Sequence, residues 1–274
     1  GDISLESSSI DIGALVGGDI VTLTSDNLEI TSSVNGSTVN ISPRNNTIPV
    51  VVGDNNVPGV TNALNVTDDE VNLISGSIII SDASRLIRES DEDDKVNWTV
   101  NTQNGGSISD PVNWSNDIKF ESISTIEGDS GQDIFDVENG GEIITIRGGG
   151  QVDTFNISGT VTNIFGDSGG DVFQIDGGVV TTANGNEGSD TFIVTDTNPG
   201  DVDTLIGGIG DDTITVDTDG VVGTINGNAG MDEFIITNGG QVTGTISGNS
   251  GDDKFTVTNS GVVDTISGGN GNDT

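Results

Sequence analysis

The chain has 274 residues, among them 42 glycines, 44 acidic residues and seven Lys or Arg, and it has no Cys, His or Tyr. The missing Cys and His exclude disulfides, Cys/His zinc sites and Ser–His catalytic triads. The formal net charge of −37 argues against nucleic acids and anionic membranes as partners, and no apolar run is long enough to span a bilayer.

Residues 1–82 repeat a strand-like pattern with low fidelity. Gly1-Asp-Ile-Ser-Leu5 recurs as Gly18-Asp-Ile-Val-Thr-Leu23 and, more loosely, as Gly36-Ser-Thr-Val-Asn-Ile41. Apolar residues alternate with polar ones in these segments, which is typical of strands that bury one face. We therefore expect residues 1–82 to form irregular coils of a β-helix.

Residues 83–125 do not follow this pattern. They contain the cations Arg85, Arg88 and Lys95, an acidic run at 89–94, and both tryptophans, Trp98 and Trp114. A junction between two coil geometries, or a loop excursion from the coils, explains such a stretch. The alternative is a binding loop, because long loops often carry function.

Residues 126–274 repeat with a period of about twenty, which is typical of solenoids. Each repeat is anchored by an aspartate, at spacings of 18 to 22 residues: Asp133, Asp153, Asp171, Asp190, Asp212, Asp232, Asp253 and Asp273. A large apolar residue follows two positions later, and six of the eight phenylalanines stand there. A disordered chain has no reason to place its aromatic residues at one phase of a repeat.

Each repeat contains two short strands and two turns. The strands are too short to bury a face alone, so successive repeats must stack. Twenty residues are also too few for a helical crossover. The sequence therefore predicts an all-β fold, a right-handed parallel β-helix or β-roll solenoid with about 20 residues per coil and about 13 or 14 coils in all.

The turn before each aspartate reads Gly-(Asp/Asn/Gly)-x-Gly-x-Asp-x-Phe. Its second position holds only the residue types that best tolerate left-handed backbone, so a positive φ is expected there. These residues are Asp129, Gly149, Asp167, Asn186, Gly208, Asn228, Asn249 and Gly269.

This turn resembles the calcium-binding nonapeptide of the RTX (repeat-in-toxin) family. The resemblance implies that the eight aspartates, Asp133 to Asp273, bind Ca²⁺ between stacked coils. Only one turn per coil has the motif, so calcium would line one edge, and Gln151 replaces a glycine before Asp153. The alternative is that each aspartate only caps its own turn by accepting backbone N–H bonds.

Two further segments resemble large secreted bacterial repeat proteins. Residues 118–128 are similar to the strand that leads into their Gly-rich coils, and residues 18–82 resemble the β-helical repeats of filamentous-haemagglutinin-type adhesins. The resemblance implies a secreted or cell-surface bacterial protein that is adhesive or matrix-forming, with a surface receptor or glycan as partner.

The favoured function is a non-enzymatic rod or fibre segment that is rigidified by calcium. Neither end carries a polar capping segment, so end-to-end stacking is expected. The alternative is a β-helical polysaccharide lyase or glycosidase. Its case is weaker because the carboxylates fall at regular repeat phases, as on a solvated edge, and few cations are available for an acidic sugar.

Overall fold

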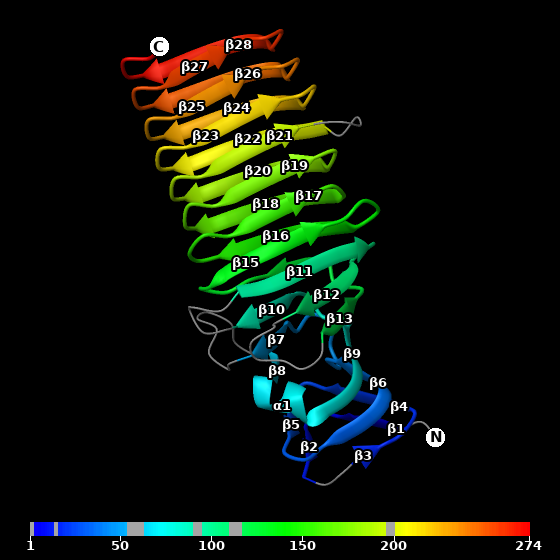
Figure 1. Ribbon diagram of the computed structural model, residues 1–274. Coiled ribbons are helices and arrows are strands. Elements are labelled where there is room, and N and C mark those ends of the chain that lie inside the picture. Colours follow the sequence, from blue (N-terminus) through cyan, green and yellow to red (C-terminus); the bar gives the residue numbers. More distant parts are fainter. Residues whose placement is uncertain (1–2, 14–15, 54–62, 90–94, 110–116, 196–200) are drawn as a thin grey trace.

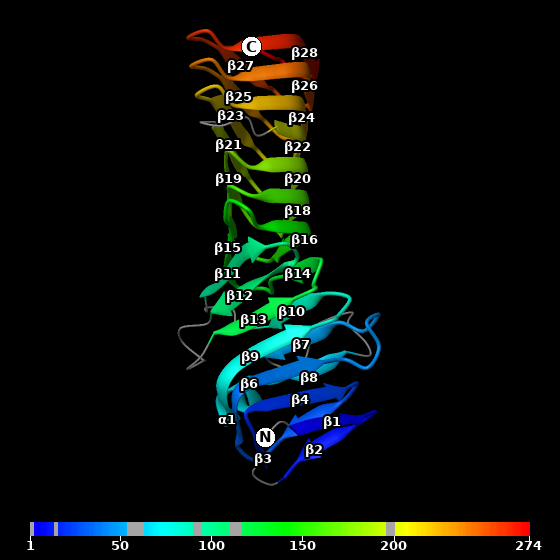
Figure 2. The same ribbon diagram turned by 90° about the vertical axis from the view of Figure 1, so that its right-hand side faces the viewer.

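The computed structural model describes residues 3–13, 16–53, 63–89, 95–109, 117–195 and 201–274. Strands make up 67% of the chain and stack in parallel as a β-solenoid of about 12 turns, with roughly 20 residues in each turn. Figures 1 and 2 show the coils rising one above another from the N-terminal to the C-terminal end. The expected all-β parallel solenoid is confirmed.

A fifteen-stranded sheet, which we call the first wall, runs along the solenoid. In spatial order it contains β1 (Ile3–Ser7), β4 (Ile20–Ser25), β6 (Val34–Ser42), β9 (Ile74–Ser81), β13 (Ile118–Glu121), β12 (Gly105–Ser109), β11 (Lys95–Thr102), β15 (Gln132–Val137), β17 (Thr154–Ile157), β19 (Val172–Asp176), β21 (Thr191–Thr195), β23 (Thr213–Asp217), β25 (Glu233–Ile236) and β27 (Lys254–Val257). The short strand β3 (Val16–Gly17) pairs with β6 outside this order.

An eleven-stranded sheet forms the second wall. In spatial order it contains β8 (Leu64–Val66), β7 (Val50–Gly53), β10 (Leu86–Glu89), β14 (Thr125–Glu127), β16 (Glu142–Gly149), β18 (Thr160–Ser168), β20 (Val179–Glu187), β22 (Asp201–Ile209), β24 (Val221–Ala229), β26 (Gln241–Ser250) and β28 (Val262–Asn270). A separate two-stranded sheet of β2 (Ile10–Ile12) and β5 (Leu28–Ile30) lies near the N-terminal end, close to the one helix of the described residues, α1 (Asp68–Leu73).

From β15 onward, each coil gives one strand to each wall, and equivalent residues pair across coils. Phe135 faces Phe155, which faces Phe173, and in the second wall Ile146 faces Ile164. Along β15, β17 and β19 of the first wall, buried and more exposed residues alternate. This period of two puts the whole column of large apolar residues inside the solenoid.

The buried phenylalanines stack ring on ring. Ring centroids are 5.1 Å apart from Phe135 to Phe155, 4.7 Å from Phe155 to Phe173 and 4.3 Å from Phe173 to Phe192. Each of these four side chains is fully buried, which stabilises the fold by about 1.5–3 kcal/mol per residue before conformational entropy is counted. The narrow interior is thereby filled with few apolar residues per coil.

The turns before the aspartates have the predicted left-handed backbone. At the second motif position φ lies between +73° and +127° in seven of the eight turns, at Gly149, Asp167, Asn186, Gly208, Asn228, Asn249 and Gly269. Asp129, in the first turn, is the exception and has no positive φ. It belongs to the coil at which the regular repeats begin, where the contacts differ, as described below.

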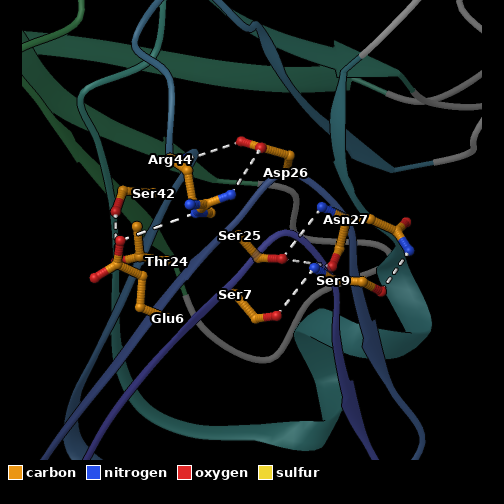
Figure 3. Close-up of polar contacts among 9 residues, drawn as sticks. All are labelled: Glu6, Ser7, Ser9, Thr24, Ser25, Asp26, Asn27, Ser42 and Arg44. Atoms are coloured by element: carbon orange, nitrogen blue, oxygen red, sulfur yellow. Dashed lines mark hydrogen bonds and ion pairs between the residues drawn. The ribbon is translucent and has the colours of Figure 1, made fainter.

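The first three coils are aligned as the sequence repeats predict, since Leu5 pairs with Leu23 and Leu23 with Ile41. Their turns are joined by polar side chains from neighbouring coils, as Figure 3 shows. Asn27 Nδ2 donates to Ser9 Oγ at 3.1 Å, and Arg44 lies 3.9 Å from carboxylate oxygens of both Glu6 and Asp26.

The stretch between the irregular and regular coils is built into both walls. Strand β10 pairs with β7 on one side and β14 on the other. Strands β11, β12 and β13 form an antiparallel meander inserted in the first wall between β9 and β15. Trp114 and residues 90–94 lie outside the described residues.

The expected number of coils was slightly too high, since the solenoid has about 12 turns rather than 13 or 14. The meander gives three strands to one wall where a regular coil gives one. Strand β8 and helix α1 likewise interrupt the passage from β7 to β9. The number of coils obtained by dividing the whole length by the repeat period takes no account of these insertions.

Candidate functional site

The eight predicted aspartates lie in one column at the entry to the strands of the first wall. Seven of them are at most 1% exposed: Asp133, Asp153, Asp171, Asp190, Asp212, Asp232 and Asp253. Asp273, in the last coil, is half-buried. The expectation of carboxylates on a solvated edge is therefore wrong. Each aspartate stands two residues before a buried Phe or Ile, and the period-two pleat turns both side chains inward.

The aspartates form a continuous hydrogen-bonded ladder. The backbone N–H of each donates to Oδ1 of the aspartate in the following coil, at 2.7 to 3.1 Å, in all seven steps from Asp133 to Asp273. These bonds satisfy buried backbone N–H groups that lie just before the strands of the first wall, where the hydrogen bonds between strands have not yet begun. The capping alternative has the right kind of donor, but in these steps the donor belongs to the neighbouring coil.

The second carboxylate oxygen of most ladder residues has no hydrogen-bond partner in the described part of the chain. This holds for Oδ2 of Asp153, Asp171, Asp190, Asp212, Asp232 and Asp253. Each Oδ2 packs against the glycine five residues earlier, and a Cβ on that glycine would overlap the carboxylate. These oxygens are both dry and unsatisfied, which is costly for an ionised carboxylate.

Burial accordingly raises the pKa of the ladder carboxyls. Removal from water is the largest cause at every step, and it raises the pKa of Asp153 to about 9, of Asp171 and Asp212 to about 7, and of Asp190 and Asp232 to about 6. The backbone N–H bonds oppose this shift because they favour the charged form. A proton on Oδ2 is thus one way to neutralise Asp153, Asp171 and Asp212 near neutral pH.

The N-terminal end of the ladder is closed by a tryptophan. Trp98 Nε1 donates to Asp133 Oδ1 at 3.2 Å, in place of the backbone N–H that occupies this oxygen in later coils. The Trp98 ring stacks on Phe135 at 5.7 Å, and so begins the aromatic column as well. Arg88 is fully buried, and its positive charge lowers the pKa of Asp133, although burial and the charge of Asp129 raise that pKa overall.

Sequence reasoning missed this role of Trp98, although a signal was present. Val96-Asn-Trp98 has the same spacing as Asp133-Ile-Phe135, and the structure pairs these residues one to one. Gln151, which replaces the later glycine of the motif before Asp153, has a φ of +61°. Asp153 nevertheless accepts from the Asp133 N–H like the other ladder residues.

A calcium ion would have to use the unsatisfied Oδ2 atoms. They would supply one carboxylate oxygen per coil, and the carbonyl of a neighbouring glycine lies beside each of them. Calcium prefers six to eight oxygen ligands. Among the described residues no group of three or more acidic side chains gathers as a metal site. The column thus meets only part of the requirement, and calcium binding stays a prediction.

Comparison of the chain with protein-family models, with curated proteins and with solved structures found no match. No helix within the described ranges is long and apolar enough to cross a membrane. The functional reading therefore depends on the geometry of the ladder and on the architecture.

Proposed function

We propose that the chain is a non-enzymatic structural rod, a segment of a secreted or cell-surface bacterial adhesin or matrix fibre. The aspartate ladder carries this proposal. It links every coil from Asp133 to Asp273 by the same bond, and the phenylalanine stack runs beside it. Repeats that contact only their neighbours and pack identically suit a protein whose task is to span distance.

End-to-end contact is part of the proposal. In the last coil Phe255 and Val263 are only partly buried and Val257 is 42% exposed, whereas the equivalent Phe234, Val242 and Ile236 are at most 1% exposed. A coil laid on this surface, from a second copy or a continuing chain, would bury these residues and extend both walls. Sedimentation of the purified chain over a hundredfold concentration range tests self-association.

A structural rod, unlike a lyase or glycosidase, should have no activity on polysaccharides. Incubating the purified chain with acidic and neutral polysaccharides should leave their chain lengths unchanged. Depolymerisation above the level of a boiled control would overturn the structural proposal in favour of a β-helical polysaccharide lyase or glycosidase.

The calcium component has its own test. Bound Ca²⁺ stabilises the folded state by mass action, by about 2.7 kcal/mol at a hundredfold excess over the dissociation constant, and so raises the melting temperature. We expect the native chain to melt higher in millimolar CaCl₂ than in EDTA, and the shift to shrink in Asp212→Asn. Equal melting temperatures in CaCl₂, MgCl₂ and EDTA would show that calcium does not bind the folded chain. The ladder carboxylates would then be neutralised by protonation.

A further inference from the structure

Opposite the first wall, the pairing of strands is interrupted between the second and third coils. Strands β5 and β8 contact each other but are not paired as strands. Glu70 of helix α1 bridges them instead. Its Oε1 accepts from the Ile30 N–H at 2.7 Å, and its Oε2 accepts from the Thr67 N–H at 2.7 Å and from Thr67 Oγ1 at 3.0 Å. This carboxylate fixes the distance between the two strands.

A cleft of about 390 Å³ opens at this interruption. Its polar side chains come from β5 and β8, from residues that flank these strands, and from α1: Asn27, Glu29, Thr31, Asn65, Thr67 and Glu70. The side chains of Leu28 and Ile30 are buried below, so β5 presents its polar face to the opening. The volume lies at the small end of the range for ligand clefts, about 300–1,000 Å³.

Two of the lining side chains are available to bind a ligand. Within the described part of the chain, the side chains of Glu29 and Asn65 make no hydrogen bond, while those of Asn27 and Thr67 are held by Ser9 and Glu70. The cleft therefore combines a fixed frame with an available carboxylate and an available amide. These two groups together offer acceptors and donors to one ligand.

The chemistry of the lining selects among ligand classes. Among the described residues that line the cleft none is cationic, and the net charge of −37 repels anions. Calcium takes six to eight oxygen ligands, but Glu70 already accepts three hydrogen bonds, which leaves Glu29 as the one available carboxylate among the described lining residues. Amides, hydroxyls and one carboxylate are instead suited to a ligand rich in neutral hydroxyl groups, because a carboxylate can accept from two adjacent hydroxyls.

We propose that this cleft binds a neutral sugar unit of a glycan, with Glu29 and Asn65 as the recognising side chains. The inference rests on the proposed adhesive function, to which it adds a ligand class argued from the lining of the cleft. A failure here would leave the rod architecture and its own tests untouched.

Saturation-transfer NMR of the full chain with a panel of neutral methyl hexosides and N-acetylhexosaminides tests this inference. At least one probe should receive saturation, and calorimetric titration of that probe should give a dissociation constant. Asn65→Ala should weaken it at least tenfold. Glu29→Gln should weaken it only several-fold, because the amide still accepts a hydrogen bond. Gln174→Ala, on the exposed face of β19, should leave it unchanged.

Two results would overturn the inference. One is the absence of saturation transfer to every probe in a chain whose melting is normal. The other is binding that Asn65→Ala leaves intact although this variant melts like the native chain. A CaCl₂ titration whose heat disappears in Glu29→Gln would assign the cleft to a cation instead.

Discussion

At the scale of single residues, the ladder depends on the glycine five positions before each aspartate. At Gly207 an added Cβ would overlap Asp212 Oδ2 and would lie 2.9 Å from the carbonyl oxygen of Gly227. The same arrangement recurs at Gly148, Gly166, Gly185, Gly227 and Gly248. The glycine is required here by close packing of a carboxylate against the chain, because these six residues do not have positive φ.

We expect Gly207→Ala to destabilise the protein by about 1–3 kcal/mol, the usual cost of overpacking a well-packed interior. Thermal melting should show this as a loss of about 2–4 °C per kcal/mol. Gly17→Ala is the matched control, because among the described residues the atom nearest to its Cβ would be Asn35 O, at 3.7 Å. Equal melting temperatures for the two variants would contradict the packing of the ladder.

The raised pKa values predict that stability falls as pH rises. Asp171 has a folded pKa of about 7 against an ordinary value of 3.8, so the folded chain holds its proton more tightly than the unfolded chain. Its contribution is complete below about pH 4 and is lost as pH rises through 7. The native protein should therefore melt several degrees higher at pH 5 than at pH 8.5.

Asp171→Asn isolates this effect from the general repulsion of surface charge. The amide oxygen still accepts the Asp153 N–H, and no charge forms at this position at high pH. The variant should lose less stability between pH 5 and 8.5 than the native chain, whereas Asp203→Asn, on the surface, should behave like the native chain. A pH dependence unaltered by Asp171→Asn would show that this carboxyl is not buried as described.

At the scale of elements, β11 converts an irregular solenoid into a regular one. It pairs antiparallel with β12 on one side and parallel with β15 on the other. On the parallel side Val96 stands opposite Asp133 and Trp98 opposite Phe135. Strand β11 thus places apolar side chains opposite the first ladder residue. Its indole N–H donates to Asp133 in place of the backbone N–H of a preceding aspartate.

Two substitutions at Trp98 separate these contributions. Trp98→Phe keeps a ring on Phe135 but removes the donor to Asp133, and should cost about 1–3 kcal/mol. Trp98→Ala also removes the ring and should cost about 3–5 kcal/mol. Urea unfolding measures both. A Trp98→Phe variant as stable as the native chain would show that Asp133 does not need the indole.

The period of the sequence predicted the elements of residues 126–274 because each position there has one environment, repeated in every coil. Phe135 and Phe155 are inward for the same reason, and the left-handed turns follow from residue type alone. The pattern could not tell whether the aspartates face in or out, since a carboxylate is expected in water. The aspartates face inward because they stand two residues before an inward Phe or Ile on the same strand, and because glycines such as Gly148 leave room for the carboxylates.

Glu70 and the cleft could not be foreseen, because they join segments forty residues apart that share no repeat.

At the scale of the whole molecule, the solenoid is a stack in which, from β15 onward, each coil repeats the contacts of the last. Stiffness then comes from continuity of the ladder and the ring stack along the axis, and the length is set by the number of coils. A defect in one coil should act locally, because the interior residues contact mainly the coils above and below. This property distinguishes the solenoid from a globular domain with one shared core.

Distances between spin labels test the stacking most directly, and the absence of native cysteines makes labelling simple. Asn156 and Thr256 occupy the same outward column, five coils apart. Labels at these positions should be separated by about 24 Å, and moving one label by a coil should change this distance by about 4.8 Å. Broad distributions, or distances that do not change in equal steps per coil, would contradict the in-register stack.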